Sequence, residues 1–259
     1  MSRTGIIAPM PVEAAPLIPA SARKLEASGR CHFWYEWESA GTHVSLACSG
    51  VGMRKAAEAA RWLLDELRVD RVIVCGVAGG LAPGCRTGSL VLPQEVRAYT
   101  APSEGGFIAR GPLDVGAVGP CYPVDATLRE AALGVAAAPP LEGLLVSVRG
   151  LVTHPPILGW LHQGLSATAI DMESAAAAEV CSQSGVPFLV VRALSDHAPE
   201  LARWDWAGLA RARKRGRLAL AAHFLRNPAL ALRLWRLQRD IDRGARAAAA
   251  LVLKILNKM

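Results

Sequence analysis

The sequence runs Ile170-Asp171-Met172-Glu173-Ser174, then through an alanine-rich stretch, to Phe188-Leu189-Val190-Val191-Arg192-Ala193-Leu194-Ser195-Asp196. This order predicts a helix that begins near Glu173 and a buried apolar strand that ends near Asp196. In an open α/β sheet, ligands bind outside the carboxyl ends of the strands. Glu173 and Asp196 are therefore candidates for one functional site.

Apolar runs and helical stretches alternate along the rest of the chain. Its 259 residues, 52% of them hydrophobic, are enough for one large core. Strands without polar alternation are typical of a sheet covered by helices on both faces. We expect strands at 5–8, 44–48, 71–75, 89–92, 143–147 and 187–194, a crossover helix at 53–67, and a loop over the site at 98–118. We therefore predict an α/β protein: one three-layer domain with a central mixed sheet at residues 1–226, and a basic amphipathic helical extension at 227–259.

Cysteine usage and hydropathy exclude several classes of protein. The six cysteines form no Cys-x-x-Cys pair and lack histidines at metal-finger spacing, so we expect reduced thiols and no metal site. The apolar run before Pro9 is too short for a signal peptide. No stretch of about 18 apolar residues is present to span a membrane. These features predict a cytoplasmic protein.

Two glycine-bearing turns follow predicted strands, Ser49-Gly50-Val51-Gly52 and Gly76-Val77-Ala78-Gly79-Gly80. Without side chains in the way, backbone N–H groups there can approach a phosphate or ribose oxygen. Either turn alone is also explained as a plain tight turn. Because both are expected at the same edge of one sheet, we interpret them as part of a binding site.

Five motifs in order carry a resemblance to a known family. They are Gly5-Ile6-Ile7-Ala8-Pro9-Met10-Pro11-Val12-Glu13, Ser49-Gly50-Val51-Gly52, Gly76-Val77-Ala78-Gly79-Gly80, Ile170-Asp171-Met172-Glu173 and Val191-Arg192-Ala193-Leu194-Ser195-Asp196. Across residues 5–225 the chain resembles the superfamily of purine nucleoside phosphorylases and methylthioadenosine/S-adenosylhomocysteine nucleosidases. The resemblance implies cleavage of a purine N-glycosidic bond without a metal or organic cofactor, usually by a homodimer.

The resemblance gives Asp196 the role of general acid. The aspartate at this place protonates the purine N7, and the adjacent serine, Ser195, helps to hold it. A departing purine carries negative charge, so protonation of the leaving group is worth about 10²–10⁴ in rate. The alternative for Asp196 is a plain helix N-cap after the strand.

The same resemblance places Glu173 on the ribose hydroxyls and Met172 beneath the sugar, with Ala78 and Gly79 as further substrate contacts. The alternative for Glu173 is a first-turn acid that complements the helix dipole. The purine-binding segment of the family normally contains an aspartate and an aromatic residue. Here the matching segment is Arg149-Gly150-Leu151-Val152, in which Leu151 and Val152 still offer backbone groups to the base.

Glu13 helps to indicate whether water or phosphate is the nucleophile. In the hydrolytic branch of the superfamily a glutamate at this place activates water, whereas the phosphorylases bind phosphate with arginines. The presence of Glu13 favours water, while Ser49, Gly50 and Arg54 form a candidate phosphate site, so phosphate stays open as a co-substrate. The alternative for Glu13 is a solvated acid in a proline-bounded loop.

The C-terminal part alone makes the protein basic. Between Pro199 and Met259 there are fourteen Lys or Arg and four acids, and this surplus exceeds the net charge of +7. Asn227-Pro228 is typical of a helix start, and Leu230, Leu234 and Ile241 recur on one side. Such an arginine-rich amphipathic helix fits an anionic membrane surface. The alternatives are packing on its own domain or a second copy and, with no supporting motif, nucleic-acid binding.

Residues 171–174 and the tail are similar to the hopanoid-associated nucleoside phosphorylases of bacteria. Those enzymes remove adenine from the lipid adenosylhopane on the way to ribosylhopane. This resemblance implies a lipid-linked nucleoside substrate and a peripheral position on the inner face of the cytoplasmic membrane. Two alternatives remain, a soluble methylthioadenosine/S-adenosylhomocysteine nucleosidase and a noncatalytic membrane-binding module.

Overall fold

The computed structural model describes residues 2–25, 31–83, 85–100, 108–109 and 117–258. Its strands are β1 (Ser2–Ala8), β2 (Arg23–Leu25), β3 (Phe33–Ser39), β4 (Thr42–Cys48), β5 (Arg71–Gly80), β6 (Leu90–Val91), β7 (Glu95–Thr100), β8 (Ile108–Ala109), β9 (Ala117–Pro123), β10 (Leu144–Val148), β11 (Leu151–Val152), β12 (Ala167–Asp171) and β13 (Phe188–His197). Its helices are α1 (Pro11–Ala14), the 3-10 turn η1 (Ala15–Leu17), α2 (Met53–Asp65), α3 (Ala126–Leu133), α4 (Pro155–Gln163), α5 (Ser174–Gln183), α6 (Ala198–Leu201), α7 (Trp206–Lys214), α8 (Arg217–Arg226) and α9 (Pro228–Lys258).

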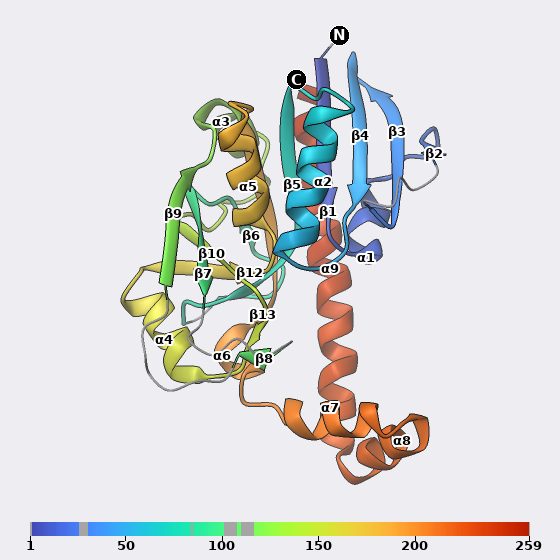
Figure 1. Ribbon diagram of the computed structural model, residues 1–259, viewed down its shortest axis with the longest axis vertical. Helices are drawn as coiled ribbons and strands as arrows, with labels where there is room; N and C mark the ends of the chain where they lie inside the picture. The colour runs from blue at the N-terminus through green and yellow to red at the C-terminus, as the bar shows by residue number, and fades with distance from the viewer. Residues whose placement is uncertain (1, 26–30, 84, 101–107, 110–116, 259) are drawn as a thin grey trace.

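The main sheet is mixed and follows the order β2-β3-β4-β1-β5-β12-β10-β7-β9, with β13 and β6 branching from β5. Its centre is parallel: β1 pairs with β4 and β5, and Ile6 lies opposite both Leu46 and Ile73. Helices α2 and α9 cover opposite faces of this region (Figure 1). The predicted three-layer α/β fold is confirmed.

The parallel strands that the sequence predicted are the fully buried ones. Ile6, Ile73 and Val190 have no exposed surface, as expected of strands covered on both faces. Strands β3, β7, β9 and β12 were not predicted, because polar residues, glycine or proline interrupt the apolar pattern of the first three and β12 has only five residues. The predicted loop at 98–118 was partly wrong, since β7 extends into it and it contains β8; its other residues lie mostly outside the described ones.

Strand β5 pairs with two strands that run in opposite directions. It pairs in parallel with β13 through its last residue, and its last two residues also pair antiparallel with β12, so that Gly79 lies opposite both Asp196 and Ile170. The end of β5 is therefore flanked by the ends of β12 and β13. This convergence brings Asp171 and Asp196, far apart in the sequence, to the same edge of the sheet.

Helix α9 has two halves with different surroundings. Residues 244–256 pack into the core, where Ala245, Val252 and Ile255 have no exposed surface. At Gly244 a Cβ atom would lie 3.1 Å from Val77 Cγ1, so glycine permits this close approach. Residues 228–243 extend away from the sheet and carry α7 and α8 at their far end (Figure 1). Only the first half of the predicted extension therefore projects from the domain; its second half is core.

Within the described residues, no helix is long and apolar enough to cross a membrane.

The two halves of α9 predict opposite responses to the same substitution. Leu251 is 2% exposed and Leu232 is 47% exposed. Leu251→Ala should lower the free energy of unfolding by about 2–5 kcal/mol, because it leaves a cavity in the core. Leu232→Ala should change it by about 0.5 kcal/mol or less. Urea unfolding of the two variants checks this, and equal losses would contradict the packing of the second half.

Candidate active site

A cavity of about 310 Å³ opens at the carboxyl ends of the central strands. Every residue predicted to catalyse the reaction or bind the nucleoside lines it: Glu13, Ala78, Gly79, Leu151, Val152, Met172, Glu173, Ser195 and Asp196. Met10, Val51 and Leu201 add further apolar surface. The geometry thus brings together residues from α1, β5, β11, the β12–α5 junction and β13.

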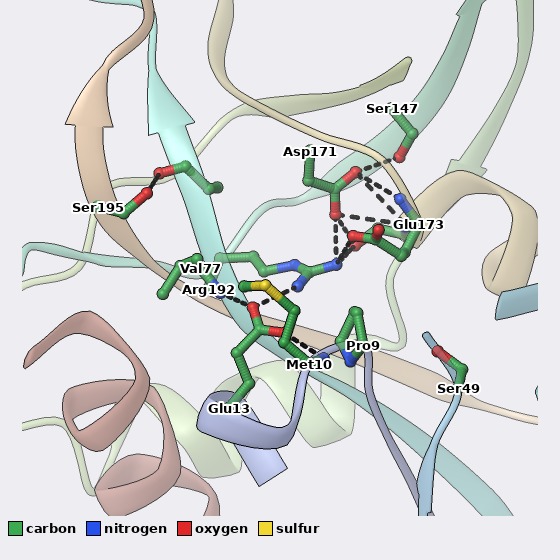
Figure 2. A network of polar contacts seen from close by, with 12 residues as sticks. Pro9, Met10, Glu13, Ser49, Val77, Ser147, Asp171, Glu173, Arg192 and Ser195 are labelled. Carbon is green, nitrogen blue, oxygen red and sulfur yellow. Dashed lines mark hydrogen bonds and ion pairs between the residues drawn. The ribbon is translucent and has the colours of Figure 1, made fainter. Parts of the chain in front are cut away.

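The guanidinium of Arg192 lies at the centre of the polar part of this region, fully buried on β13. Its Nη2 donates to Asp171 Oδ2 at 2.6 Å and to Glu173 Oε2 at 3.3 Å. Its Nη1 lies 3.9 Å from Glu13 Oε1. Figure 2 shows the guanidinium between Glu13 on one side and the other two carboxylates on the other. We call these four residues the carboxylate cluster.

Glu13 is fixed by backbone groups on both of its oxygens. Oε2 accepts from the Met10 amide at 2.7 Å and Oε1 from the Val77 amide at 2.8 Å. The first bond caps the short helix α1, and the second ties α1 to the glycine-rich end of β5. Glu13 is 2% exposed, so its interpretation as a solvated loop acid is wrong.

Glu173 and Asp171 are held by the start of α5 and the neighbouring strands. Glu173 Oε1 accepts from the Gly52 amide at 2.9 Å, which links it to the first predicted glycine turn. Asp171 accepts hydrogen bonds from the hydroxyls of Ser147 and Ser174. Asp171 thereby anchors Arg192, and Glu173 stands between the guanidinium and the cavity.

Three carboxylates share one guanidinium, and the pKa values of Glu13 and Glu173 are raised in these surroundings. The pKa of Glu173 is raised to about 7, because burial and the charges of Asp171 and Glu13 together outweigh the lowering effect of Arg192. Burial also raises the pKa of Glu13, against the lowering effect of Arg192. Like charges in a shared site cannot all ionise easily, so the cluster retains a proton near neutrality.

Asp196 lies at the end of β13, apart from the cluster. The hydroxyl of Ser195 donates to Asp196 Oδ1 at 2.6 Å. Burial raises the pKa of Asp196 to about 6, although this hydrogen bond and His197 lower it. A carboxyl group that keeps its proton to about pH 6 in a cavity is suited to general acid catalysis.

The three residues predicted to bind phosphate do not line the cavity. Ser49, Gly50 and Arg54 are absent from the described lining of the cavity. The Ser49 hydroxyl donates to the Gly50 carbonyl at 3.0 Å, and Arg54 pairs with Glu58 on α2 and lines a separate surface groove. The structure therefore does not assemble these groups around the cavity. Among the residues described, no group of three or more His, Cys, Asp or Glu is placed to hold a metal ion.

Sequence reasoning missed the functional importance of Arg192 and Asp171. Arg192 lies within a strand of otherwise apolar residues, and a buried charge in such a strand needs a charged partner. That requirement is a signal that the sequence does contain. Which acids supply the partners depends on the convergence of β12 and β13, which local sequence does not reveal.

Comparisons with known proteins agree with this geometry. A family model described as the phosphorylase superfamily matches residues 3–226. A 5'-methylthioadenosine/S-adenosylhomocysteine nucleosidase of Geobacillus kaustophilus is 36% identical over 165 residues, which are 62% of this chain and 69% of the relative. The chain therefore belongs to the phosphorylase superfamily. As the sequence predicted, it is an enzyme of the nucleoside phosphorylase and nucleosidase class.

Solved structures share the whole architecture. The nucleosidase of the same name from Neisseria meningitidis, in complex with methylthio-immucillin-A, superposes with a TM-score of 0.74 at 25% identity and covers 100% of both chains. The native futalosine hydrolase of Helicobacter pylori gives a TM-score of 0.73 at 18% identity and covers 100% of this chain and 98% of its own, which shows the fold alone.

Gly76 tests how tightly the carboxylate cluster is packed. A Cβ atom at Gly76 would meet both Arg192 Nη1 and Glu13 Oε1 at 2.4 Å. Gly76→Ala should therefore lower the free energy of unfolding by about 1–3 kcal/mol or more. The control is Gly159→Ala on helix α4, where nothing lies within 4 Å, and it should gain about 0.5–1 kcal/mol. Equal behaviour of the two variants in urea unfolding would contradict the close packing.

Proposed function

We propose that the protein releases adenine from an adenosine whose sugar carries a large apolar substituent, with adenosylhopane as the substrate. The observation that supports this reaction is one cavity lined both by Asp196 and by the three acids of the carboxylate cluster. The reaction needs a proton for the departing base, a negative charge near the sugar and a group that activates the nucleophile. It needs no metal or organic cofactor.

In the proposed mechanism Asp196, hydrogen-bonded to Ser195, donates its proton to N7 as the glycosidic bond breaks. The bonding electrons leave with the base, and the sugar acquires positive charge. Glu173 accepts hydrogen bonds from the ribose hydroxyls and stabilises that charge. Met172 packs against the sugar, while Ala78, Gly79, Leu151 and Val152 contact the nucleoside.

Glu13 then takes a proton from water as the water oxygen bonds to the sugar carbon. Buried Arg192 Nη1 has no hydrogen-bond partner among the described residues, and it faces Glu13 Oε1. A water molecule between them would satisfy this donor while Glu13 activates it. This arrangement, and the placement of Arg54 outside the cavity, supports water over phosphate as the nucleophile.

A second opening supports a substrate larger than a small thioether. A trough of about 500 Å³ between the domain and α9 shares Ser195, Asp196 and Leu201 with the cavity. Its lining combines the apolar side chains of Trp204 and Leu237 with charged ones, among them Glu200, Arg233 and Arg236. A long apolar arm that exceeds the cavity has a path along this trough toward the basic helix.

The location that fits this substrate is the inner face of the cytoplasmic membrane, reached through the C-terminal helix. We propose peripheral association there, as a homodimer, with no role for nucleic acid.

The second candidate function is hydrolysis of methylthioadenosine or S-adenosylhomocysteine, which the name of the 36% identical relative favours. A noncatalytic module has no such support, because Glu13, Glu173 and Asp196 share one cavity.

Asp196→Asn should lower kcat by about 10² or more, because the amide cannot donate the carboxyl proton. The matched control is Asp205→Asn, since Asp205 caps α7 through the Gly208 amide and asparagine caps equally well. In the unsubstituted enzyme, kcat/KM should fall as the pH rises through about 6, the pKa of Asp196. Adenine release measured across pH checks both points. Near-normal activity of Asp196→Asn would remove this residue from the mechanism.

The substrate is tested by adenine release from adenosylhopane in vesicles, beside methylthioadenosine, each with and without phosphate. We expect efficient release from the lipid and no dependence on phosphate. Release from methylthioadenosine alone would replace the lipid proposal with the second candidate. A requirement for phosphate would contradict water as the nucleophile.

A further inference from the structure

Helices α7 and α8 and residues 228–243 of α9 form a projection that stands away from the sheet (Figure 1). The projection concentrates exposed apolar side chains. Of the four large apolar side chains exposed in the described part of the chain, Leu225, Leu232 and Trp235 lie on it, with exposed fractions of 84%, 47% and 59%. The fourth, Val51, lines the cavity. Apolar groups gathered in this way indicate an interaction surface.

The projection carries a large excess of positive charge. Residues 206–243, which include α7, α8 and the projecting part of α9, contain ten Lys or Arg and two acids, Asp240 and Asp242. All ten cations are exposed, and among the described residues one of them, Arg243, has an ion pair, with Asp240. Such a density of positive charge repels a second copy of the same surface and attracts an anionic one.

Within the projection, two sides of α9 carry different residues and have different surroundings. Leu232, Trp235 and Arg239 recur at three- and four-residue spacing and therefore share one side. The guanidinium of Arg239 lies 5.0 Å from the centre of the Trp235 ring. Arg233, Arg236 and Leu237 instead line the trough that leads to Asp196. One side thus faces away from the trough, while the other borders the route to the active site.

We infer that the projection docks on the surface of an anionic lipid bilayer. Leu225, Leu232 and Trp235 insert at the level of the headgroups, and the surrounding arginines bind lipid phosphates. This inference deepens the membrane association proposed above and assigns it to α7, α8 and the exposed half of α9 rather than to the whole C-terminal helix. Because the buried half of α9 fixes the projection to the sheet, docking sets the orientation of the domain, and of the trough on the other side of α9, relative to the membrane.

The test is cosedimentation of the full chain with vesicles of phosphatidylcholine alone or with roughly a third of phosphatidylglycerol. We expect binding to the anionic vesicles only, and weaker binding as salt is added. Leu225→Ser/Leu232→Ser/Trp235→Ser should weaken it at least about tenfold. Arg211→Gln/Arg213→Gln/Arg215→Gln should weaken it about fivefold per charge. The matched control is Arg23→Gln/Arg61→Gln/Arg68→Gln on the rest of the domain, which removes equal charge and should bind normally.

Equal loss in the control, equal binding to neutral vesicles, or full binding by the apolar triple variant would overturn the docking surface. Self-association that the triple variant abolishes, without vesicle binding, would assign the surface to a second copy instead. Adenine release from a soluble nucleoside is measured in parallel and should not change in these variants, since none of the substituted residues lines the cavity. Vesicle binding without adenine release from any nucleoside supports the docking surface and contradicts the proposed reaction.

Discussion

The buried guanidinium of Arg192 is the constraint on which the site depends. It ties Glu13 from α1, Asp171 from the end of β12 and Glu173 from the start of α5 to one point on β13. Removing one partner from such a buried ionic group costs about 3–5 kcal/mol, because the remaining charges are left uncompensated. The same interaction that assembles four elements at the sheet edge therefore also fixes the positions of the three acids.

The carboxylate cluster contains three acids and one cation, and this excess of acids affects its protonation. With three carboxylates around one guanidinium, full ionisation is unfavourable, and the pKa of Glu173 is raised to about 7. Asp196 lies apart from Arg192, and its pKa is raised for another reason, its burial at the end of β13. The fold thus places Asp196, the proposed proton donor, and a separate group of acids on one cavity, which fits the proposed cleavage with opposite charges on the base and the sugar.

The sequence predicted the buried parallel strands and the position of Asp196 and Glu173, because apolar runs and strand ends are local features. It did not predict that β5 pairs with β12 and β13 in opposite directions, which depends on tertiary packing. Arg192 was visible as a charge in an apolar strand, yet its partners follow only from that convergence. For α9, the arginine pattern indicated one amphipathic extension, whereas small residues such as Gly244 and Ala248 allow its second half to enter the core.

The most direct test of this account is the carboxyl ¹³C NMR titration of glutamate-labelled protein, with Glu13→Gln and Glu173→Gln spectra to assign the two signals. Burial and the neighbouring charges of Asp171 and Glu13 predict that the Glu173 carboxyl titrates near pH 7, and that it titrates at lower pH once the negative charge of Glu13 is removed. If both glutamates titrate near the ordinary value of about 4.3, the carboxylate cluster does not hold a proton at neutral pH, and the proposed division of roles between Asp196 and the cluster is contradicted.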